Sequence, residues 1–287
     1  MSKINAQHPI RLDSLTGVSQ TLMIPLFCRA WEHETANSLL PDPMAATIVS
    51  QLNVLLENSD NPYHQSMLTR RWPALLKLIM SMRARHFDRR CLDFIQRHPD
   101  AQVVMLGCGL DSRYERLNQP DIPWYNLDLP HVMNLRQQLF PTYATVNDLA
   151  YSVLDFKWFE HIDQRRPTIF LAEGLFMYLA RSQTRHLFKH LAENFTGELI
   201  AEVMSQPAIQ AVGNKILQVT TRMESGTVFV GGLYHSREPE AWHPQIRFVD
   251  DWTFFDEREP RLGLHNLVRF TPYQRIQWVV RYQLESL

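Results

Sequence analysis

Residues 102–112 read Gln-Val-Val-Met-Leu-Gly-Cys-Gly-Leu-Asp-Ser, and this stretch decides the fold. Its first half, residues 102–106, is a short and mostly apolar run, which is typical of a strand buried in a parallel sheet. Gly107 and Gly109 follow directly, and glycine lets a backbone approach a ligand closely because it has no Cβ atom. The stretch therefore predicts a strand, a tight turn and a ligand held at that turn.

Similar apolar runs recur along the chain and alternate with segments of helical spacing. We expect further strands over residues 124–129, 168–172, 198–203 and 276–284. Between them, residues 132–139 and 183–195 carry apolar side chains at helical intervals. Strands that alternate with helices predict a doubly wound α/β sheet.

The residues before this alternating region have a different pattern. Residues 17–58 read as helical pieces with a break at Pro41-Asp42-Pro43, and residues 72–98 read as one or two helices. Residues 205–240 are the least regular. There we expect a helix and then a glycine-containing loop, residues 226–232, that lies over the site.

The composition excludes several classes of protein. Hydrophobic residues make up 45% of the 287, enough to bury a sizeable core. The 29 basic and 30 acidic residues nearly cancel, whereas a strongly basic nucleic-acid binder would carry a positive excess. We therefore expect no nucleic acid partner. We also expect no membrane span, because no run of about 18 apolar residues occurs.

The N-terminal residues and the cysteines bear on the compartment. Residues 1–11 lack the charged and then apolar pattern of a signal peptide, so we expect a cytoplasmic protein. Cys28, Cys91 and Cys108 are scattered, which fits a reducing compartment and offers no closely spaced pair of metal ligands. The sequence therefore predicts no metal site.

The glycine turn and the next strand together indicate the kind of ligand. A dinucleotide fingerprint needs a third glycine where this chain has Ser112, so a pyrophosphate is disfavoured. Asp128 ends the next strand, about 20 residues on, where an acid accepts both ribose hydroxyls. A ribose without phosphates fits S-adenosylmethionine, and NAD is the alternative. If no ligand binds, the glycines are a structural turn and Asp128 caps a helix.

Several motifs, in this order, carry a resemblance to a known family. They are Asp42-Pro-Met-Ala45, Arg83-Ala-Arg85, Leu106-Gly-Cys-Gly-Leu-Asp-Ser-Arg113, Trp124-Tyr-Asn-Leu-Asp-Leu-Pro130, Ala172-Glu-Gly-Leu-Phe-Met-Tyr-Leu179 and Asp251-Trp-Thr-Phe-Phe-Asp256. The chain resembles the leucine carboxyl methyltransferase family, and most closely its bacterial branch of tetracenomycin-type polyketide carboxyl O-methyltransferases. The resemblance extends over nearly the whole chain.

This resemblance implies a fold and a division of the chain. The fold is a Rossmann-like class I methyltransferase, with a seven-stranded, mostly parallel sheet and an N-terminal helical lid. Residues 1–287 then form one methyltransferase domain. Residues 1–98 are the lid, and residues 99–287 are the S-adenosylmethionine-binding core, with a substrate-covering insertion around residues 205–245.

The resemblance also implies residue roles toward the cofactor. Arg83 matches the arginine that contacts the methionine carboxylate, and Glu173 matches the acid beside the sulfonium. Gly107, Gly109 and Asp128, followed by Leu129, match the glycine turn and the ribose site. Much of the family has Asp-Leu after the third strand, near the adenine. This chain has Ser152-Val153 there, with Asp155 close behind, and either Ser152 or Asp155 is the adenine contact.

The implied acceptor is a small-molecule carboxylic acid. A carboxylate is ionised at pH 7 and needs no base, but it needs donors that aim one oxygen at the methyl group. Arg29 and Tyr178 are the candidates for this catalytic role. Alternatively, Arg29 pairs with Glu32 or Glu34, and Tyr178 is a core aromatic whose hydroxyl bonds to backbone. For Arg113 we expect a structural ion pair.

Three other functions stay open at this point. A hydroxyl acceptor would need a base, for which His235, His243 and His265 are available. The chain would otherwise methylate a protein C-terminal carboxylate, or bind the cofactor without catalysis. Trp252, Phe254 and Phe255 are expected to pack against the sheet and not to form a cofactor cage.

Overall fold

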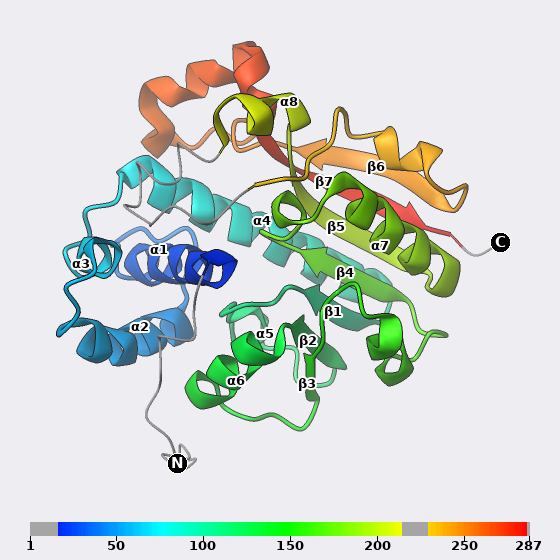
Figure 1. Cartoon of the computed structure of the whole chain (residues 1–287), viewed down its shortest axis with the longest axis horizontal. Coiled ribbons are helices and arrows are strands. Elements are labelled where there is room, and N and C mark those ends of the chain that lie inside the picture. The colour runs from blue at the N-terminus through cyan, green and yellow to red at the C-terminus, as the bar shows by residue number, and fades with distance from the viewer. Residues whose placement is uncertain (1–16, 214–228, 286–287) are drawn as a thin grey trace.

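A computed structural model describes residues 17–213 and 229–285 of the chain, and a seven-stranded sheet runs through it (Figure 1). The strand order is β3-β2-β1-β4-β5-β7-β6. The valine-containing run forms β1 (Gln102–Leu106), all five residues of which are buried, as the sequence predicts for an interior strand. The expected doubly wound, mostly parallel sheet of seven strands is therefore present.

The remaining strands follow this order on both sides of β1. β2 (Trp124–Asp128), β4 (Thr168–Ala172) and β5 (Gly197–Met204) agree closely with the predicted runs. β1 to β5 pair with one another in parallel, whereas β7 (Gln277–Leu284) runs antiparallel between β5 and β6 (Ile246–Trp252). Between β1 and β4 the chain changes the direction in which it adds strands, and doubly wound sheets bind ligands at such a switch point.

Two strands were not apparent in the apolar pattern, and both lie at the edges of the sheet. β3 (Val146–Ala150) buries only Leu149 among its five residues, and the apolar residues of β6 are interrupted by Arg247, Asp250 and Asp251. An edge strand has one unpaired side and partly faces water, so it does not need a continuous apolar run. The strand pattern in the sequence is accordingly weak at these two places.

Within the described residues, four α-helices precede the sheet. They are α1 (Met23–His33), α2 (Pro43–Leu56), α3 (Pro62–Leu68) and α4 (Ala74–Arg97). The predicted break at residues 41–43 is the start of α2, where the Asp42 side chain accepts from the Ala45 amide and Pro43 takes the first helical position. α1 packs on α2 and α4, and the long α4 brings this layer to the sheet (Figure 1).

The helices after β1 are all shorter than α4. They are α5 (Arg113–Leu117), α6 (Pro130–Leu139), α7 (Arg181–Asn194) and α8 (Gln206–Ala208). Short 3₁₀ segments complete the chain, among them η2 (Gly17–Leu22), η3 (Phe156–His161), η4 (Phe176–Tyr178) and η7 (Pro260–Phe270). The segments 132–139 and 183–195, for which helical spacing was found, correspond to α6 and α7.

The irregular segment after β5 is only partly described. α8 continues into one π-helical turn, η5 (Ile209–Gly213), where the described part of this segment stops. Of the expected glycine loop, residues 226–228 lie outside the described residues. Residues 229–233 pass along η4, where the amide of Val230 donates to the carbonyl oxygen of Met177 at 2.8 Å.

The aromatic residues near the end of β6 pack as expected. Trp252 stacks on His86 with ring centroids 4.2 Å apart, and Phe254 meets Trp252 edge-on. Phe255 is partly buried against the same core. These rings therefore hold α4 to the sheet and do not form a cofactor cage.

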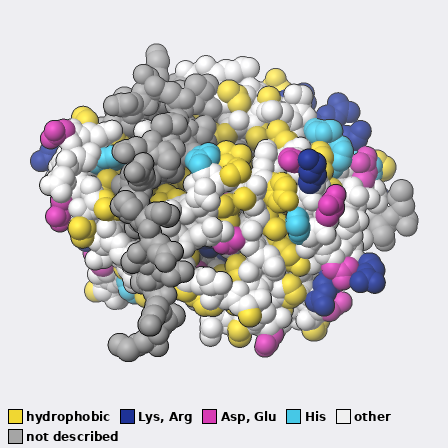
Figure 2. All heavy atoms as spheres, turned by 60° about the horizontal axis from the view of Figure 1, so that its bottom comes forward, with side chains coloured by type: hydrophobic (Ala, Val, Ile, Leu, Met, Phe, Trp, Pro, Cys, Tyr) yellow, Lys and Arg dark blue, Asp and Glu magenta, His cyan; other side chains and the backbone are white. Residues whose placement is uncertain are grey.

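The surface agrees with a nearly neutral chain. On the face shown in Figure 2, acidic and basic side chains occur together, mostly toward the edges, and hydrophobic side chains are spread across the middle. Among the described helices, none combines the length and the apolar character needed to cross a membrane.

Candidate active site

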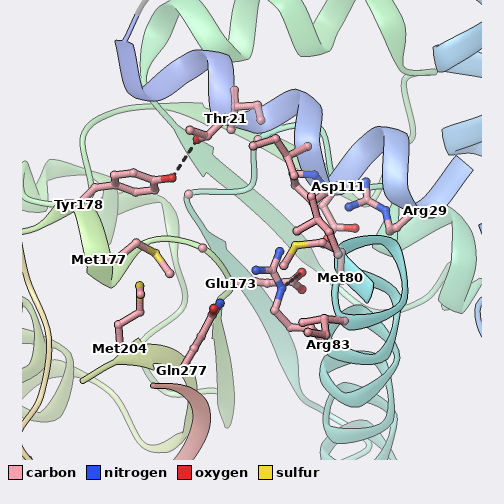
Figure 3. Close-up of a pocket in the computed structure, with 18 of the residues that line it drawn as sticks. Thr21, Arg29, Met80, Arg83, Asp111, Glu173, Met177, Tyr178, Met204 and Gln277 are labelled. Atoms are coloured by element: carbon pink, nitrogen blue, oxygen red, sulfur yellow. Dashed lines mark hydrogen bonds and ion pairs between the residues drawn. The ribbon is translucent and has the colours of Figure 1, made fainter. Parts of the chain in front are cut away.

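A pocket of about 410 Å³ lies at the carboxyl ends of β1 and β4, at the switch point of the sheet. Strand ends form one side of it, and η2, α1 and α4 form the other (Figure 3). The lining includes Thr21, Arg29, Met80, Arg83, Gly107, Gly109, Asp111, Glu173, Met177, Tyr178, Met204, Phe229, Ile276 and Gln277.

The two glycines form the tight turn that the sequence predicts. Gly107 and Gly109 have φ angles of +68° and +50°, a left-handed conformation that is costly for other residues. The amides of Gly107 and Cys108 donate to the carbonyl oxygen of Leu127 at 2.8 and 3.0 Å, which ties the turn to β2. A Cβ atom on Gly109 would lie 2.7 Å from Leu22 Cδ2, so the N-terminal segment packs directly on the turn.

Asp128 ends β2 and braces the same turn. Its carboxylate accepts from the amides of Gly109 at 2.8 Å and Leu129 at 2.7 Å. The alternative that Asp128 caps α6 is wrong, because Leu129 is the N-cap residue of that helix. Burial raises the pKa of Asp128, and the two amide donors oppose that shift. A carboxylate has about four acceptor positions, so Asp128 can accept from two further donors.

Arg83 connects two carboxylates in the wall of the pocket. Its Nε donates to Glu173 Oε1 at 2.8 Å, and its Nη1 donates to Glu202 at 2.8 and 3.0 Å. Figure 3 shows Arg83, from α4, beside Glu173, which directly follows β4. Burial alone would lower the pKa of Arg83, but Glu202 and Glu173 outweigh it and raise the pKa above its ordinary value. Arg83 therefore stays charged.

Arg113 continues these ion pairs from Glu173 to Asp88 and Asp111. It lies 2.6 Å from Glu173, 2.7 Å from Asp88 and 2.9 Å from Asp111, and only 1% of its side chain is exposed. The structural ion pair expected for Arg113 is confirmed. Because Glu173 accepts from Arg83 and Arg113, its position is set from two sides.

Arg29 lines the pocket, but its guanidinium already has partners. Nε donates to Asp42 at 3.0 Å and Nη2 donates to the carbonyl oxygen of Leu110 at 2.8 Å. The alternative pairing of Arg29 with Glu32 or Glu34 is wrong, since other arginines pair with both of these acids. To hold an acceptor, Arg29 would use its remaining donors or give up one of these contacts.

Ser112 has a structural partner in the position where the dinucleotide fingerprint requires glycine. Its Oγ lies 2.8 and 2.6 Å from the two carboxylate oxygens of Asp42, and Arg116 Nη1 reaches the same carboxylate at 2.9 Å. Burial would raise the pKa of Asp42, but Arg116, Arg29 and Ser112 hold it below its ordinary value. Ser112 thus fastens the start of α2 to the glycine turn.

Tyr178 points its hydroxyl across the pocket. The hydroxyl donates to Thr21 Oγ1 at 3.1 Å, a contact between η4 and η2 (Figure 3). The alternative of a core tyrosine bonded to backbone is therefore wrong. Burial raises the pKa of Tyr178 to about 12, so its hydroxyl remains a proton donor at neutral pH.

The far end of the pocket is apolar. Met177, Met204, Phe229 and Ile276 line it, and the amide of Gln277 points from β7 toward the region of Glu173 and Arg83 (Figure 3). The pocket thus combines a charged end at the glycine turn with an apolar end beyond Tyr178.

Five residues expected at the cofactor do not line this pocket: Asp128, Leu129, Ser152, Val153 and Asp155. They lie at or just after the ends of β2 and β3, at the same edge of the sheet. Ser152 Oγ accepts from a backbone amide two residues later at 3.2 Å, and Asp155 caps η3 in the same way at 3.4 Å. Their expected adenine contacts stay predictions.

The three histidines considered as bases lie elsewhere. His235 and His265 are exposed, and His243 lies 3.8 Å from Glu193 of α7. The described residues that line the pocket include no histidine. The described residues also contain no cluster of three or more metal-binding side chains.

Glu202 and Gln277 are residues of the site that inspection of the sequence missed. A carboxylate within the fully buried strand β5 signals a partner, because a buried charge must be paired. The signal is ambiguous, since Glu198 in the same strand is equally buried and pairs with Arg281 at the opposite end of the strand.

The comparisons with known proteins agree with this geometry. A family model described as leucine carboxyl methyltransferase matches residues 23–192, more than half of the chain. The chain is 29% identical to the tetracenomycin polyketide synthesis O-methyltransferase TcmP of Streptomyces glaucescens, over 84% of this chain and 85% of that protein. It is 28% identical to the S-adenosyl-L-methionine-dependent methyltransferase dpfgK of Gibberella zeae, over 91% and 87%.

Solved structures share the fold. A Thermobifida fusca protein that is named provisionally as a methyltransferase superposes with a TM-score of 0.56 at 16% identity, covering 87% of this chain and all of that one. A DUF574 family protein of Streptomyces avermitilis superposes with a TM-score of 0.55 at 14% identity, covering 84% and 97%.

Proposed function

Because the chain belongs to the leucine carboxyl methyltransferase family and is an S-adenosylmethionine-dependent methyltransferase, we propose that it methylates a carboxylate oxygen of an apolar small molecule. The observation that carries the proposal is the two-ended pocket. Its charged end suits the amino-acid part of the cofactor, and its apolar end, reached past Tyr178, suits the body of an acid.

The residues at the charged end fit the cofactor. Arg83 would hold the methionine carboxylate, and Glu173 would lie near the positively charged groups. Asp128, with two acceptor positions left, would accept the ribose hydroxyls next to the turn of Gly107 and Gly109. When bound, the cofactor supplies an electrophilic methyl group. In the same proposal, α1 to α4 act as the lid over this end.

The acceptor end favours a nucleophile that is ionised without help. A carboxylic acid has a pKa near 4 and is an anion at neutral pH. A hydroxyl acceptor would need a base, and the described lining offers no histidine for that purpose. The Tyr178 hydroxyl, kept protonated by its raised pKa, would donate to the acceptor and orient it. Arg29 is the second candidate donor.

The apolar end indicates the rest of the acceptor. Methionine side chains adapt their shape to irregular apolar ligands, and Met177 and Met204 both line this end. The relative TcmP is named for tetracenomycin polyketide synthesis. A natural-product acid of this kind is the acceptor class that we propose.

Mass spectrometry and alkaline treatment of the methylated product test the proposal. The protein is incubated with S-adenosylmethionine and a panel of apolar carboxylic acids, and matched panels of phenols and of peptides with free C-termini are the controls. We expect a methyl ester, which alkali cleaves. A base-stable methyl ether would establish hydroxyl methylation, and a methylated peptide C-terminus would establish a protein substrate. If no panel is turned over although the cofactor binds, a non-catalytic module is favoured.

Variants of the two candidate donors test their role. Tyr178→Phe should lower turnover at least tenfold while cofactor affinity, measured by calorimetry, changes little. Arg29→Ala should also lower turnover, but it additionally leaves the buried Asp42 without one of its partners and should lower thermal stability. Tyr234→Phe is the matched control, because Tyr234 is exposed and outside the pocket. Unchanged turnover in Tyr178→Phe would remove Tyr178 from the mechanism.

The pH profile of the rate separates the two kinds of acceptor. With an ionised carboxylate the rate should be nearly flat from about pH 6 to pH 8, because no essential group titrates there. A hydroxyl activated by histidine would instead give a rate that rises through about pH 6.5.

A further inference from the structure

Glu202 lies directly behind the surface of the pocket. Its side chain has no exposed area, and it accepts from Arg83 at 2.8 Å and from the Gly174 amide at 2.6 Å. It also accepts from the Gln277 side-chain amide. Arg83, Gly174 and Gln277 all line the pocket, so Glu202 is separated from a bound ligand by one layer of atoms.

The ion pairs around Glu202 leave its negative charge incompletely compensated. The salt bridges that start at Glu202 connect nine side chains, four arginines and five acids. Glu173 shares Arg83 and Arg113, whereas among the described residues Arg83 is the one cation paired with Glu202. Arg136 contributes another positive charge, but it contacts the backbone at Asp111, at the other end of this group. The excess negative charge therefore lies at the Glu202 end.

Methyl transfer changes the charge of the cofactor beside this residue. S-adenosylmethionine carries a carboxylate, an ammonium and a sulfonium. When the methyl group moves to the acceptor oxygen, the electrons of the carbon–sulfur bond stay on sulfur. The product, S-adenosylhomocysteine, then has a neutral thioether and one positive charge fewer. A buried carboxylate acts strongly on such a difference, because water and salt screen it poorly.

We propose that Glu202 makes the pocket prefer S-adenosylmethionine to S-adenosylhomocysteine by charge, and so promotes release of the spent cofactor. Glu202 is on this account a specificity-determining residue that acts through the layer of Arg83, Gly174 and Gln277. The inference rests on cofactor binding in the pocket, as proposed above, and is independent of the identity of the acceptor.

Calorimetry with three ligands tests this inference without an acceptor. The ligands are S-adenosylmethionine, S-adenosylhomocysteine and sinefungin, in which an amine-bearing carbon replaces the methylated sulfur and restores the positive charge. Glu202→Gln should lower the preference for S-adenosylmethionine over S-adenosylhomocysteine about tenfold. It should lower the preference for sinefungin over S-adenosylhomocysteine to a similar extent. If the variant also shifts Arg83, the shift weakens all three ligands alike, because they share the same carboxylate. That effect therefore cancels in the two ratios.

Two further variants serve as controls. Glu202→Asp keeps the charge and should keep both ratios, even if every affinity falls. Glu198→Gln removes an equally buried acid from the same strand, but Glu198 pairs with Arg281 and Arg97 away from the pocket. This variant should leave both ratios unchanged.

The outcomes are distinct. If Glu202→Gln weakens all three ligands equally, Glu202 only supports the fold and the inference is overturned. If wild-type protein binds none of the ligands, cofactor binding at this pocket is contradicted instead. Should Glu202→Gln fail to fold by circular dichroism, wild-type affinities decide. If S-adenosylmethionine and sinefungin both bind more tightly than S-adenosylhomocysteine, the inference is supported. If S-adenosylhomocysteine binds most tightly, the inference is overturned.

Discussion

At the scale of the residue, Asp128 combines a contact to the glycine turn with a proposed contact to the ribose. It braces the Gly109 amide and, in the proposed function, accepts the ribose hydroxyls. Asp128→Ala should weaken S-adenosylmethionine binding by about 2–3 kcal/mol, since two hydroxyls lose a charged acceptor. Gly109→Val should weaken binding further, because the new side chain would meet Leu22 and the positive φ angle would strain the valine backbone. Calorimetry measures both, with the exposed Asp121→Asn as control; wild-type affinity in Asp128→Ala would show the ribose assignment to be wrong.

His86 makes the stability of the fold depend on pH. Burial, and then the nearby Arg90, lower the pKa of His86 from 6.5 to about 3. The unfolded chain therefore takes up this proton near pH 6.5 while the folded protein does not. The stabilisation is complete above pH 6.5 and is lost as the pH falls toward 3, at up to about 1.4 kcal/mol per pH unit.

A variant of His86 isolates this effect. His86→Phe keeps a ring against Trp252 but cannot take up a proton. Between pH 6.5 and pH 5, the free energy of unfolding in urea should fall by about 2 kcal/mol more for wild type than for the variant. His265→Phe, which replaces an exposed histidine, should behave as wild type. Parallel losses in wild type and His86→Phe would contradict a neutral buried His86.

At the scale of elements, the packing of residues 229–233 against η4 depends on Gly231. A Cβ atom on Gly231 would lie 1.7 Å from the carbonyl oxygen of Leu179 and 2.8 Å from that of Phe176. Gly231→Ala must therefore displace residues 229–233 from η4 and should destabilise the protein by more than about 2 kcal/mol. In Gly263→Ala the new methyl group meets nothing within 4 Å, so we expect only the cost of strain, about 1 kcal/mol. Urea unfolding compares the two; equal losses would refute the clash.

Side-chain hydrogen bonds connect elements far apart in sequence around the pocket. Thr21 of η2 meets Tyr178 of η4, and Asp42 at the start of α2 meets Ser112 beside the glycine turn. The N-terminal helices are thus attached to the sheet at both ends of the pocket. This arrangement explains why the motif Asp42-Pro-Met-Ala45 and the glycine motif occur together.

At the scale of the whole molecule, cofactor binding should be visible as stability. A ligand that binds only the folded state stabilises it by about 2.7 kcal/mol at 100 times its Kd. S-adenosylmethionine should therefore raise the melting temperature, whereas NAD at the same concentration should not, because Ser112 is committed to Asp42 where a dinucleotide site needs glycine. Differential scanning calorimetry measures the shift. An equal shift with NAD would revive the dinucleotide alternative.

Much of this protein follows from local sequence signals. The apolar runs of β1, β2, β4, β5 and β7 and the glycine turn are each encoded within a few neighbouring residues, and they indicate both the sheet and the class of ligand. A strand buried on both faces must be apolar, and a left-handed turn favours glycine, so these elements are legible without a partner. The motifs also identified the family and the position of Arg83.

The ion pairs could not be predicted from the sequence in this way. Arg83 and Glu202 are 119 positions apart, and Arg29 turned out to bind Asp42, 13 positions on, and not the nearer Glu32 or Glu34. An ion pair needs only that two side chains meet in space, and that meeting depends on how α4, the helices before it and the sheet pack together. The same packing places Gln277 at the pocket and allows the edge strands β3 and β6 to remain polar. Some residues at the pocket, such as Arg83 and Glu173, could be identified from the sequence. Their partners are set by the assembled fold, because charge interactions depend on distance in space and carry no periodic signal along the sequence.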